Sequence, residues 1–404
     1  MAVTIWEGNK AEALLSKLDK QNALLEVMAA QSLHDLSSDW AGLAELANSG
    51  LFGDAYSIGD MFVDTWKDQA TNTEYTYPYQ LAHIGNVELQ DGEILENRPF
   101  LQAHYAHPFG VQFSHQRAFL KCPEGLSAGT YYVTIESNWG TNVQAGDVIC
   151  FTTTIDIPSG GRVSGCYGAP DQAKSNWKVY THSADGKTIL ETITPTFSAS
   201  GTNLGVLKAT TRNGNLNSVQ EMAYGWNRWS TSALRQYLNS AAAIGAWWTA
   251  QDEWDIAPDQ LTTKPGFLSG CSEDFINAIK TTKVTTYPNT VNDDPGGNTP
   301  DITYDKVFIP ALEQMYISPQ KSGEGDYWEY WKRRSGRTTP MSTGQTYPNI
   351  ITYAVENHTS AQYVRLRSAH RGNALFTWYV YSSGYVNSGY YASGALRFAP
   401  VVIL

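Results

Sequence analysis

Cysteine is scarce in this chain of 404 residues, and long apolar runs are missing. Four cysteines without CxxC spacing are too few for a disulfide scaffold and do not indicate a zinc site, so we expect free thiols. No apolar run approaches the roughly eighteen residues that a membrane helix needs. The first residues, Met-Ala-Val-Thr-Ile-Trp-Glu-Gly, lack the basic start and apolar core of a secretory signal. We therefore expect no signal peptide, no membrane insertion and folding in a cytoplasm.

Basic charge is also low. The chain has 28 Lys and Arg against 39 Asp and Glu, and it contains no run rich in Lys or Arg. A protein with a formal net charge of -11 is repelled by phosphate backbones. We therefore exclude nucleic acid as a partner, and the acidic excess favours solubility.

Catalytic motifs are missing as well. The sequence has no Gly-x-Ser-x-Gly elbow. Gly186-Lys187-Thr188 looks like the end of a phosphate loop, but Thr181 stands where that loop needs its first glycine. We expect no catalytic residues, no cofactor and no enzymatic activity.

Two clusters carry residue types that bind metals. His104, His107 and His115 lie close together, but their spacing matches zinc patterns only loosely, so we expect solvated or packed histidines. Residues 292–298, Asn-Asp-Asp-Pro-Gly-Gly-Asn, offer oxygen ligands for calcium, yet the same residues build plain loops and the regular spacing of calcium ligands is missing. Calcium binding at 292–298 stays open, and we assign no metal ligands.

Residues 10–37 have helical periodicity without an internal Gly or Pro. A seam with spacings of four and three is typical of a coiled coil, and one polar Asn in it commonly fixes the register and the number of strands. The seam consists of Ala11, Leu15, Leu18, Asn22, Leu25, Ala29, Ser32 and Leu36. We expect residues 1–50 to form a coiled-coil-like helix that makes a homo-oligomer, a trimer or a dimer. An amphipathic helix docked on its own domain is the alternative.

From about Phe52 short apolar and aromatic runs alternate with Gly, Pro, Asn and Asp. This pattern predicts a β-rich, sandwich-like spacer module over residues 51–200, either a separate domain or an insertion. A final domain follows over residues 201–404. It contains a helix that Ser230 or Thr231 would cap, with a buried stripe of Ala233, Leu234, Tyr237 and Leu238.

The C-terminal region has an unusual composition. No residue between Gly372 and Leu396 is charged, and Tyr, Ser, Gly and Asn are abundant there. Tyr offers a large contact area with few rotatable bonds, while Ser, Gly and Asn add adaptable hydrogen bonding, as in antibody loops. The composition therefore indicates a binding surface. Half-buried strands whose tyrosines pack on the core are the alternative.

Several separated motifs of the final domain resemble C-type-lectin-like domains. They are Tyr224–Ser240, Trp247-Trp248, Pro265–Gly270, Tyr304–Pro310, Val364–Ser368 and Arg397–Pro400. In particular, the last 180 or so residues are similar to variable proteins of diversity-generating retroelements, whose fold is shared with formylglycine-generating enzymes. That enzymatic activity needs two cysteines, and this domain has only Cys271. The fold class that we expect is α+β: a C-terminal C-type-lectin-like domain, preceded by the β-rich module and the coiled-coil-like helix.

The resemblance also implies which C-terminal residues bind. In the variable proteins the end of the gene is overwritten by error-prone copying at adenines, which scatters Tyr, Ser, Asn and similar residues over the surface. The variable region would span residues 365–400. Its fixed scaffold would comprise Arg365, Leu366, Arg367, Ser368, Trp378, Val380, Gly384 and Arg397 through Pro400. The ligand-binding positions would be His370, Asn373, Phe376, Tyr379, Tyr381, Ser383, Tyr385, Asn387, Tyr390 and Tyr391.

The function that these implications favour is ligand binding. We expect a receptor-binding, adhesin-like protein of a phage or prophage that recognises a protein or glycan on a bacterial surface. It would reside in the virion, in the phage tail, or in the bacterial cytoplasm before release. The alternative is a structural tail or baseplate protein whose C-terminal aromatic residues pack against another virion subunit.

Overall fold

A computed structural model describes residues 38–115, 225–251, 255–291 and 293–404, together with the backbone of short strands between residues 119 and 209. The predicted coiled-coil segment, residues 10–37, lies outside these residues. Helices are short in the described part of the chain. They are α2 (Trp40–Asn48), α3 (Phe52–Ala55), α6 (Ala233–Leu238), α7 (Glu273–Ala278) and α8 (Glu329–Ser335), with 3-10 turns η3 (Trp229–Thr231), η4 (Asp259–Thr262), η5 (Phe267–Gly270) and η6 (Pro348–Ile350).

The predicted fold class is wrong. We expected an α+β chain with a C-type-lectin-like domain behind a β-rich module and a long helix, whereas the described residues form mostly antiparallel sheets with few helices. The long helix does not occur among them. The helices that do occur have four to nine residues each. None of these helices is long and apolar enough to cross a membrane.

Helix α6 shows how local sequence sets a short helix. All four residues of its predicted stripe are buried: Ala233, Leu234, Tyr237 and Leu238. The cap is Ser232 rather than Ser230 or Thr231, since its side chain accepts from the backbone N–H of Arg235 after the preceding turn η3. Asn239 Nδ2 donates to the carbonyl oxygen of Arg235 at the other end, which satisfies a terminal acceptor.

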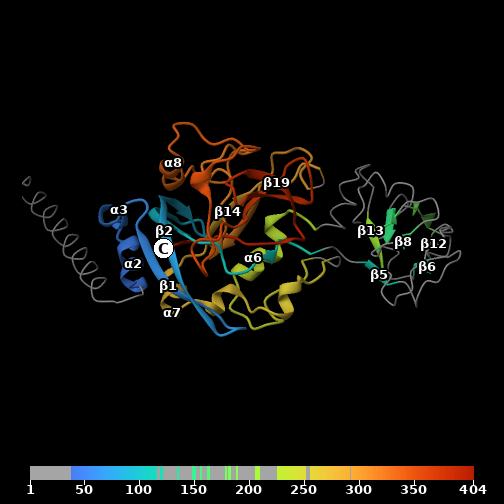
Figure 1. The fold of residues 1–404 in the computed structure, drawn as a ribbon, viewed down its shortest axis with the longest axis horizontal. Helices are drawn as coiled ribbons and strands as arrows, with labels where there is room; N and C mark the ends of the chain where they lie inside the picture. Colours follow the sequence, from blue (N-terminus) through green and yellow to red (C-terminus); the bar gives the residue numbers. More distant parts are fainter. Residues whose placement is uncertain are drawn as a thin grey trace, which may run out of the picture.

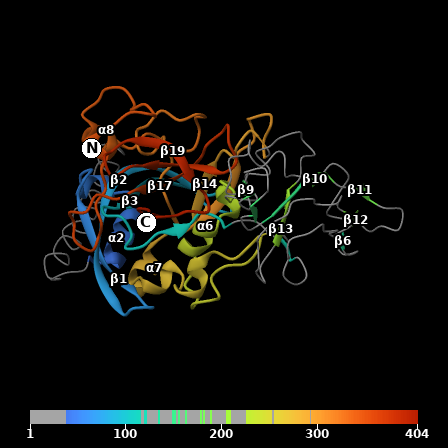
Figure 2. The same cartoon turned by 45° about the vertical axis from the view of Figure 1, so that its right-hand side comes forward.

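The largest sheet has five strands in the order β1-β2-β3-β21-β16. They are β1 (Met61–Asp68), β2 (Thr73–Glu88), β3 (Ile94–Ala103), β21 (Val401–Ile403) and β16 (Val307–Phe308). Leu101 of β3 pairs with Val402 of β21, so the chain returns after some three hundred residues to the same sheet. Figures 1 and 2 show the C-terminus beside these strands. Residues 61–103 therefore share one sheet with the end of the chain.

The C-terminal region forms a sheet of its own. Its strands are β17 (Val364–Ala369), β18 (Phe376–Val380) and β19 (Val386–Tyr391), in that order. Both pairings are antiparallel, and both contain a register shift. A bulge of this kind turns side chains away from the simple alternation along a strand. The faces of this sheet therefore cannot be assigned from odd and even numbers alone.

The remaining strands form small sheets or pairs. β4 (Val111–Gln112) pairs with β20 (Ala395–Leu396), and β14 (Thr282–Thr286) pairs with β15 (Asp301–Asp305). The other strands pair among themselves. They are β5 (Phe119–Lys121), β6 (Thr134–Ile135), β7 (Val148–Phe151), β8 (Ile155–Asp156), β9 (Arg162–Val163), β10 (Lys178–Val179), β11 (Thr181–His182), β12 (Thr188–Ile189) and β13 (Gly205–Ala209).

The core around His107 is aromatic and joins distant segments. The His107 ring is fully buried, and hydrogen bonds link it to the hydroxyls of Tyr77 (3.2 Å) and Tyr237 (3.0 Å). Burial lowers the pKa of His107 well below its usual value, so the ring is neutral. Trp66 and Phe267 pack against it. The strands of the first part of the chain and helix α6 are thus held by one polar-aromatic cluster.

Candidate functional site

The predicted scaffold of the variable region is buried. Arg365, Leu366, Arg367 and Ser368 of β17 are at most 3% exposed. Trp378, Val380 and Gly384 are buried too, as are residues 398–400, while Arg397 is partly exposed and pairs with Glu356 at 2.7 Å. Arg365 and Arg367 are two fully buried arginines on one strand, and their hydrogen bonds hold β17 in place.

Arg365 ties β17 to both other strands of the sheet and to the turn after them. Its guanidinium donates to Thr377 Oγ1 on β18, to the carbonyl oxygen of Tyr391 (3.2 Å) and to that of Gly394 (2.6 Å). It also lies 5.7 Å from the centre of the Tyr390 ring. Burial lowers the pKa of Arg365 to about 9, and its hydrogen-bond partners among the described residues include no carboxylate. Oxygen acceptors and ring faces therefore stabilise this charge.

Arg367 anchors β17 to a different set of segments from those that Arg365 contacts. It donates to Gln314 Oε1 (2.6 Å), Thr286 Oγ1 (3.0 Å) and the carbonyl oxygen of Ile309 (3.1 Å). Burial lowers its pKa to about 10, and the nearby charge of Glu324 acts against that shift. Strand β17 is consequently fixed by two guanidinium networks that bond to different segments of the chain.

The ten predicted ligand-binding residues lie on and around the β17–β18–β19 sheet. Tyr391 is 41% exposed and Ser383 is exposed, whereas Tyr379 is only 4% exposed. The others are half-buried: His370, Asn373, Phe376, Tyr381, Tyr385, Asn387 and Tyr390. Tyr379 is therefore mainly a packing residue, and the remaining positions are accessible to a partner.

The rings of this region fall into two groups. Thr377 pairs with Tyr390, and Phe376 with Tyr391, so Tyr390 and Tyr391 point to opposite faces of β19. On one face the Tyr363 and Tyr381 rings lie 4.1 Å apart, and Tyr379 contacts Tyr390 at 5.6 Å. These contacts join four rings in one cluster: Tyr363, Tyr379, Tyr381 and Tyr390.

The second group surrounds Phe376. Its ring stacks on Tyr391 with centres 5.3 Å apart, and the His370 ring stacks on Trp378 at 5.7 Å. Burial lowers the pKa of His370. Trp378 Nε1 and His370 Nδ1 are buried and have no hydrogen-bond partner among the residues that the structure describes. The His370 ring thus contacts both Trp378 and Phe376.

Side chains from other segments donate hydrogen bonds to the connection between β17 and β18. The buried Asn227 side chain donates through Nδ2 to the carbonyl oxygens of Asn373 and Phe376, both at 2.7 Å, and to that of His370 at 3.3 Å. Arg371 donates to the carbonyl oxygens of Pro288 and Gly297. The surface that carries His370, Asn373 and Phe376 is thus held by side-chain hydrogen bonds.

The acidic loop considered for calcium contributes to this support. Asp293 Oδ2 accepts from Trp226 Nε1 (2.8 Å) and from Asn289 Nδ2 (2.7 Å). Asp294 Oδ2 accepts from the backbone N–H of Thr299. Asn292 lies outside the described residues. The carboxylates of the loop are thus engaged by protein donors, as in a structural loop.

The three histidines considered for zinc lie in different surroundings. His104 Nδ1 is hydrogen-bonded to Gln80 Oε1 at 2.6 Å, and His115 lies 3.4 Å from a carboxylate oxygen of Asp259. His107 is the buried residue between two tyrosines described above. Burial lowers the pKa of His104 to about 4. Across the described ranges, no three His, Cys, Asp or Glu side chains are grouped so as to hold a metal ion. Cys271 is a free thiol, and burial raises its pKa well above the usual value.

Comparison with known proteins identifies one family. A family described as a domain of unknown function (DUF6273) matches residues 187–404. The chain belongs to this family. No curated protein and no solved structure matches the chain. The DUF6273 region contains β14 to β21 and the whole β17–β18–β19 sheet, whereas β1, β2 and β3 precede it.

Proposed function

We propose that this DUF6273 protein binds a ligand through the accessible residues of the β17–β18–β19 sheet. The ligand is a protein or glycan on a bacterial surface, and the chain serves a phage or prophage as a receptor-binding, adhesin-like protein. The observation that carries this proposal is the pairing of accessible rings with a buried, hydrogen-bonded frame. Phe376, Tyr390 and Tyr391 stand on strands of this sheet, and Tyr381 and Tyr385 lie in the turn between β18 and β19. Arg365, Arg367 and Asn227 hold the sheet in place.

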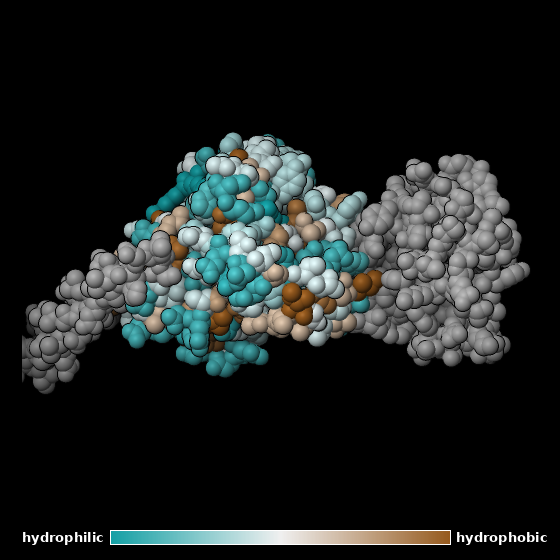
Figure 3. All heavy atoms as spheres, turned by 60° about the horizontal axis from the view of Figure 1, so that its bottom comes forward, coloured by the Kyte–Doolittle hydropathy of each residue, from teal (hydrophilic) through white to brown (hydrophobic). Residues whose placement is uncertain are grey.

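A rigid aromatic surface of this kind is suited to binding. Rings that are already ordered lose little conformational entropy when a partner arrives, and Tyr hydroxyls can bond to polar groups of a protein or a sugar. The exposed surface of the described residues is not uniformly hydrophobic. Figure 3 shows hydrophobic residues in small separate groups on the face that it displays, and the large exposed hydrophobic residues of the described part come from distant segments. Selective contact through mixed aromatic and polar groups is therefore favoured over nonspecific adhesion.

The resemblance to variable proteins of diversity-generating retroelements adds the idea that these positions differ between copies of the gene. The distribution of burial is compatible with it, because the residues assigned to the scaffold are mostly buried and nine of the ten assigned to contacts are not. Tyr379 is the exception. We assign Tyr379 to the support of Tyr381 and Tyr390, with which its ring is in contact.

The test removes three rings that are accessible and compares them with tyrosines elsewhere. Fluorescently labelled full-length protein is incubated with a panel of intact bacterial strains, and bound protein is measured by flow cytometry. The triple variant Tyr381→Ser, Tyr385→Ser, Tyr391→Ser should reduce binding at least about tenfold, since a few aromatic residues supply most of the energy of an interface. Its melting temperature should fall by no more than a few degrees, on the order of 1 kcal/mol of stability.

The control variant is Tyr304→Ser, Tyr327→Ser, which removes two accessible tyrosines outside the sheet. It should bind cells like the wild type. Retained binding by the triple variant would refute the proposal. A large drop in its melting temperature would instead identify the three rings as core residues, as in the alternative of strands whose tyrosines pack on the protein's own core.

A further inference from the structure

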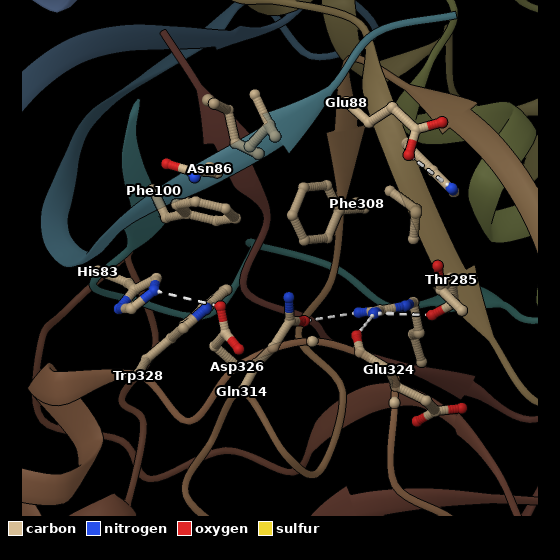
Figure 4. Close-up of a pocket in the computed structure, with 17 residues that line it drawn as sticks. His83, Asn86, Glu88, Phe100, Thr285, Phe308, Gln314, Glu324, Asp326 and Trp328 are labelled. Carbon is tan, nitrogen blue, oxygen red and sulfur yellow. Dashed lines mark hydrogen bonds and ion pairs between the residues drawn. The ribbon is translucent and has the colours of Figure 1, made fainter. Parts of the chain in front are cut away.

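A pocket of about 280 Å³ lies between the five-stranded sheet and the loop of residues 323–326. Its walls come from β2, β3, β14 and β16, and Figure 4 shows the side chains around it. The pocket belongs to none of the surfaces described above, although Arg367 forms part of its lining. Its volume lies just below the range of about 300–1,000 Å³ that is typical of ligand pockets, so it suits a small ligand.

Three aromatic side chains make the apolar part of the pocket. Phe100, Phe308 and Trp328 are at most 9% exposed. The rings of Phe100 and Trp328 lie 5.8 Å apart at a tilt of 54°. Figure 4 shows Phe100 and Phe308 side by side above the space that Gln314 faces. Such walls favour a flat ring over a flexible chain.

The charged groups at the pocket already have partners. Lys283 Nζ lies 2.7 Å from Glu88 Oε2, and His83 Nε2 lies 3.9 Å from a carboxylate oxygen of Asp326. Burial lowers the pKa of His83, so its ring is mostly neutral at pH 7. Arg367 is satisfied by the acceptors named above. A ligand with a net charge would have to break one of these pairs, whereas an uncharged ligand would not.

Hydrogen bonds within the protein hold Glu324 and the loop around it in place without a ligand. Glu324 Oε1 accepts from the backbone N–H of Tyr287 (2.8 Å), and Oε2 accepts from Ser368 Oγ. The backbone N–H groups of Gly323 and Glu324 both donate to Glu313 Oε2, at 2.8 and 2.9 Å. Burial raises the pKa of Glu324. The floor of the pocket therefore needs no rearrangement to receive a ligand.

One polar group at the pocket is left without a partner. Gln314 is 5% exposed, and its Oε1 accepts from the backbone N–H of Ala311 (2.9 Å) and from Arg367 Nη1 (2.6 Å). These two bonds fix the orientation of the amide. Its Nε2 then points into the space below Phe100 and Phe308, as Figure 4 shows, and no acceptor for it occurs among the described residues. The Nε2 atom is not among the fully buried polar atoms that lack a partner, so it can be reached from the pocket, and an acceptor on a ligand would gain a net hydrogen bond of about 1 kcal/mol there.

We propose that this pocket binds a small uncharged ring compound that accepts a hydrogen bond from Gln314 Nε2. The ring lies against Phe100, Phe308 and Trp328, and a carbonyl oxygen or ring nitrogen of the ligand faces the amide. Nucleobase-like and aromatic carbonyl compounds have this chemistry. The site is separate from the β17–β18–β19 surface, so the two proposals can fail independently.

The experiment uses three probes that differ in one feature. Acetophenone has a ring and a carbonyl acceptor, ethylbenzene has the ring without the acceptor, and benzoate adds a charge. Binding to the full-length protein is measured by saturation-transfer NMR and by titration of tryptophan fluorescence, to which Trp328 contributes. Acetophenone should bind at least about fivefold more tightly than ethylbenzene, the ratio that one hydrogen bond of about 1 kcal/mol supplies. Benzoate should bind most weakly.

Gln314→Glu tests the donor itself. The new side chain keeps an oxygen for Ala311 and Arg367 but replaces the Nε2 donor by a second oxygen. It should weaken acetophenone at least about tenfold and leave ethylbenzene within about twofold. Gln320→Glu is the matched control, because Gln320 is exposed and its Oε1 likewise accepts a backbone N–H, that of Arg371. It should leave all three affinities unchanged.

Several results would overturn the proposal. They are equal binding of acetophenone and ethylbenzene, tighter binding of benzoate, absence of binding by all three, and an unchanged acetophenone affinity in Gln314→Glu. The triple tyrosine variant should bind acetophenone like the wild type. A loss of cell binding without a loss of acetophenone binding, or the reverse, therefore separates the two sites.

Discussion

Gly384 illustrates how a single residue sets the shape of the proposed contact surface. It lies in the turn between β18 and β19 with a φ of 83°, a value that favours glycine. Its N–H donates to the carbonyl oxygen of Tyr381 (2.8 Å), and its own carbonyl oxygen accepts from the N–H of Tyr347 (2.9 Å). A side chain at this position would overlap the carbonyl oxygen of Tyr347. The turn that carries Ser383 and Tyr385 thus depends on the absence of a Cβ atom.

We predict that Gly384→Ala lowers the free energy of unfolding by about 2–4 kcal/mol, since backbone strain and steric overlap add. Gly389→Ala is the control. Its φ is not positive, and a Cβ there would have its nearest contact at 3.6 Å, from Asn387 Oδ1. That variant should stay within about 0.5 kcal/mol of the wild type. Urea denaturation followed by fluorescence measures both, and equal effects would contradict the assignment.

At the scale of a structural element, the connection between β17 and β18 depends on a side chain from a distant segment. It has few backbone hydrogen bonds of its own, and Asn227 supplies donors to three of its carbonyl oxygens. Asn289 Nδ2 donates in turn to Asn227 Oδ1 at 3.2 Å, which fixes the amide orientation. A segment far away in the sequence thereby positions His370, Asn373 and Phe376.

We predict that Asn227→Asp destabilises this connection strongly. The substitution is nearly isosteric, but it places a carboxylate oxygen against three carbonyl oxygens, so repulsion replaces attraction. The free energy of unfolding should fall by about 3–5 kcal/mol at pH 7 and by less at pH 4, where the new carboxyl group is partly protonated. Hydrogen exchange of the amides of residues 370–376 should accelerate. An exposed change of the same kind, Asn357→Asp, should have little effect; an Asn227→Asp protein as stable as the wild type would contradict this role of Asn227.

Some of these structural features could be predicted from sequence patterns. The buried stripe of α6 followed from apolar spacing and agrees with the structure. Residues 365–368, which the resemblance assigned to a fixed scaffold, are buried. Tyr379 was predicted as a contact residue and is buried, because a bulge in β18 and the neighbouring rings decide which side chains are covered. The pocket could not be predicted, since Phe100, Phe308 and Gln314 meet only through strand pairing over long separations. Local periodicity contains no information about such pairings.

At the scale of the whole molecule, the five-stranded sheet joins the two ends of the described chain. β21 lies between β3 and β16, and its residues Val401, Val402 and Ile403 are at most 2% exposed. The contacts with β3 are reinforced by Arg98, whose Nη1 lies 3.5 Å from the carbonyl oxygen of Leu404. The family match starts only at residue 187, after β1, β2 and β3. The region shared with the family therefore lacks strands that cover its last strand in this chain.

We predict that residues 187–404 expressed alone do not reach a cooperatively folded state. Without β3, the apolar residues of β21 would be exposed at a sheet edge, at a cost of about 1.5–3 kcal/mol for each large side chain, comparable in sum to the stability of a whole domain. Co-expression with residues 38–115 supplies β1, β2 and β3 and should restore a soluble complex with a sharp thermal transition. Circular dichroism during heating distinguishes the samples, with the full-length protein as reference. A sharp transition of the 187–404 fragment without its complement would show that the shared region folds alone, and that β1–β3 are an addition rather than part of its core.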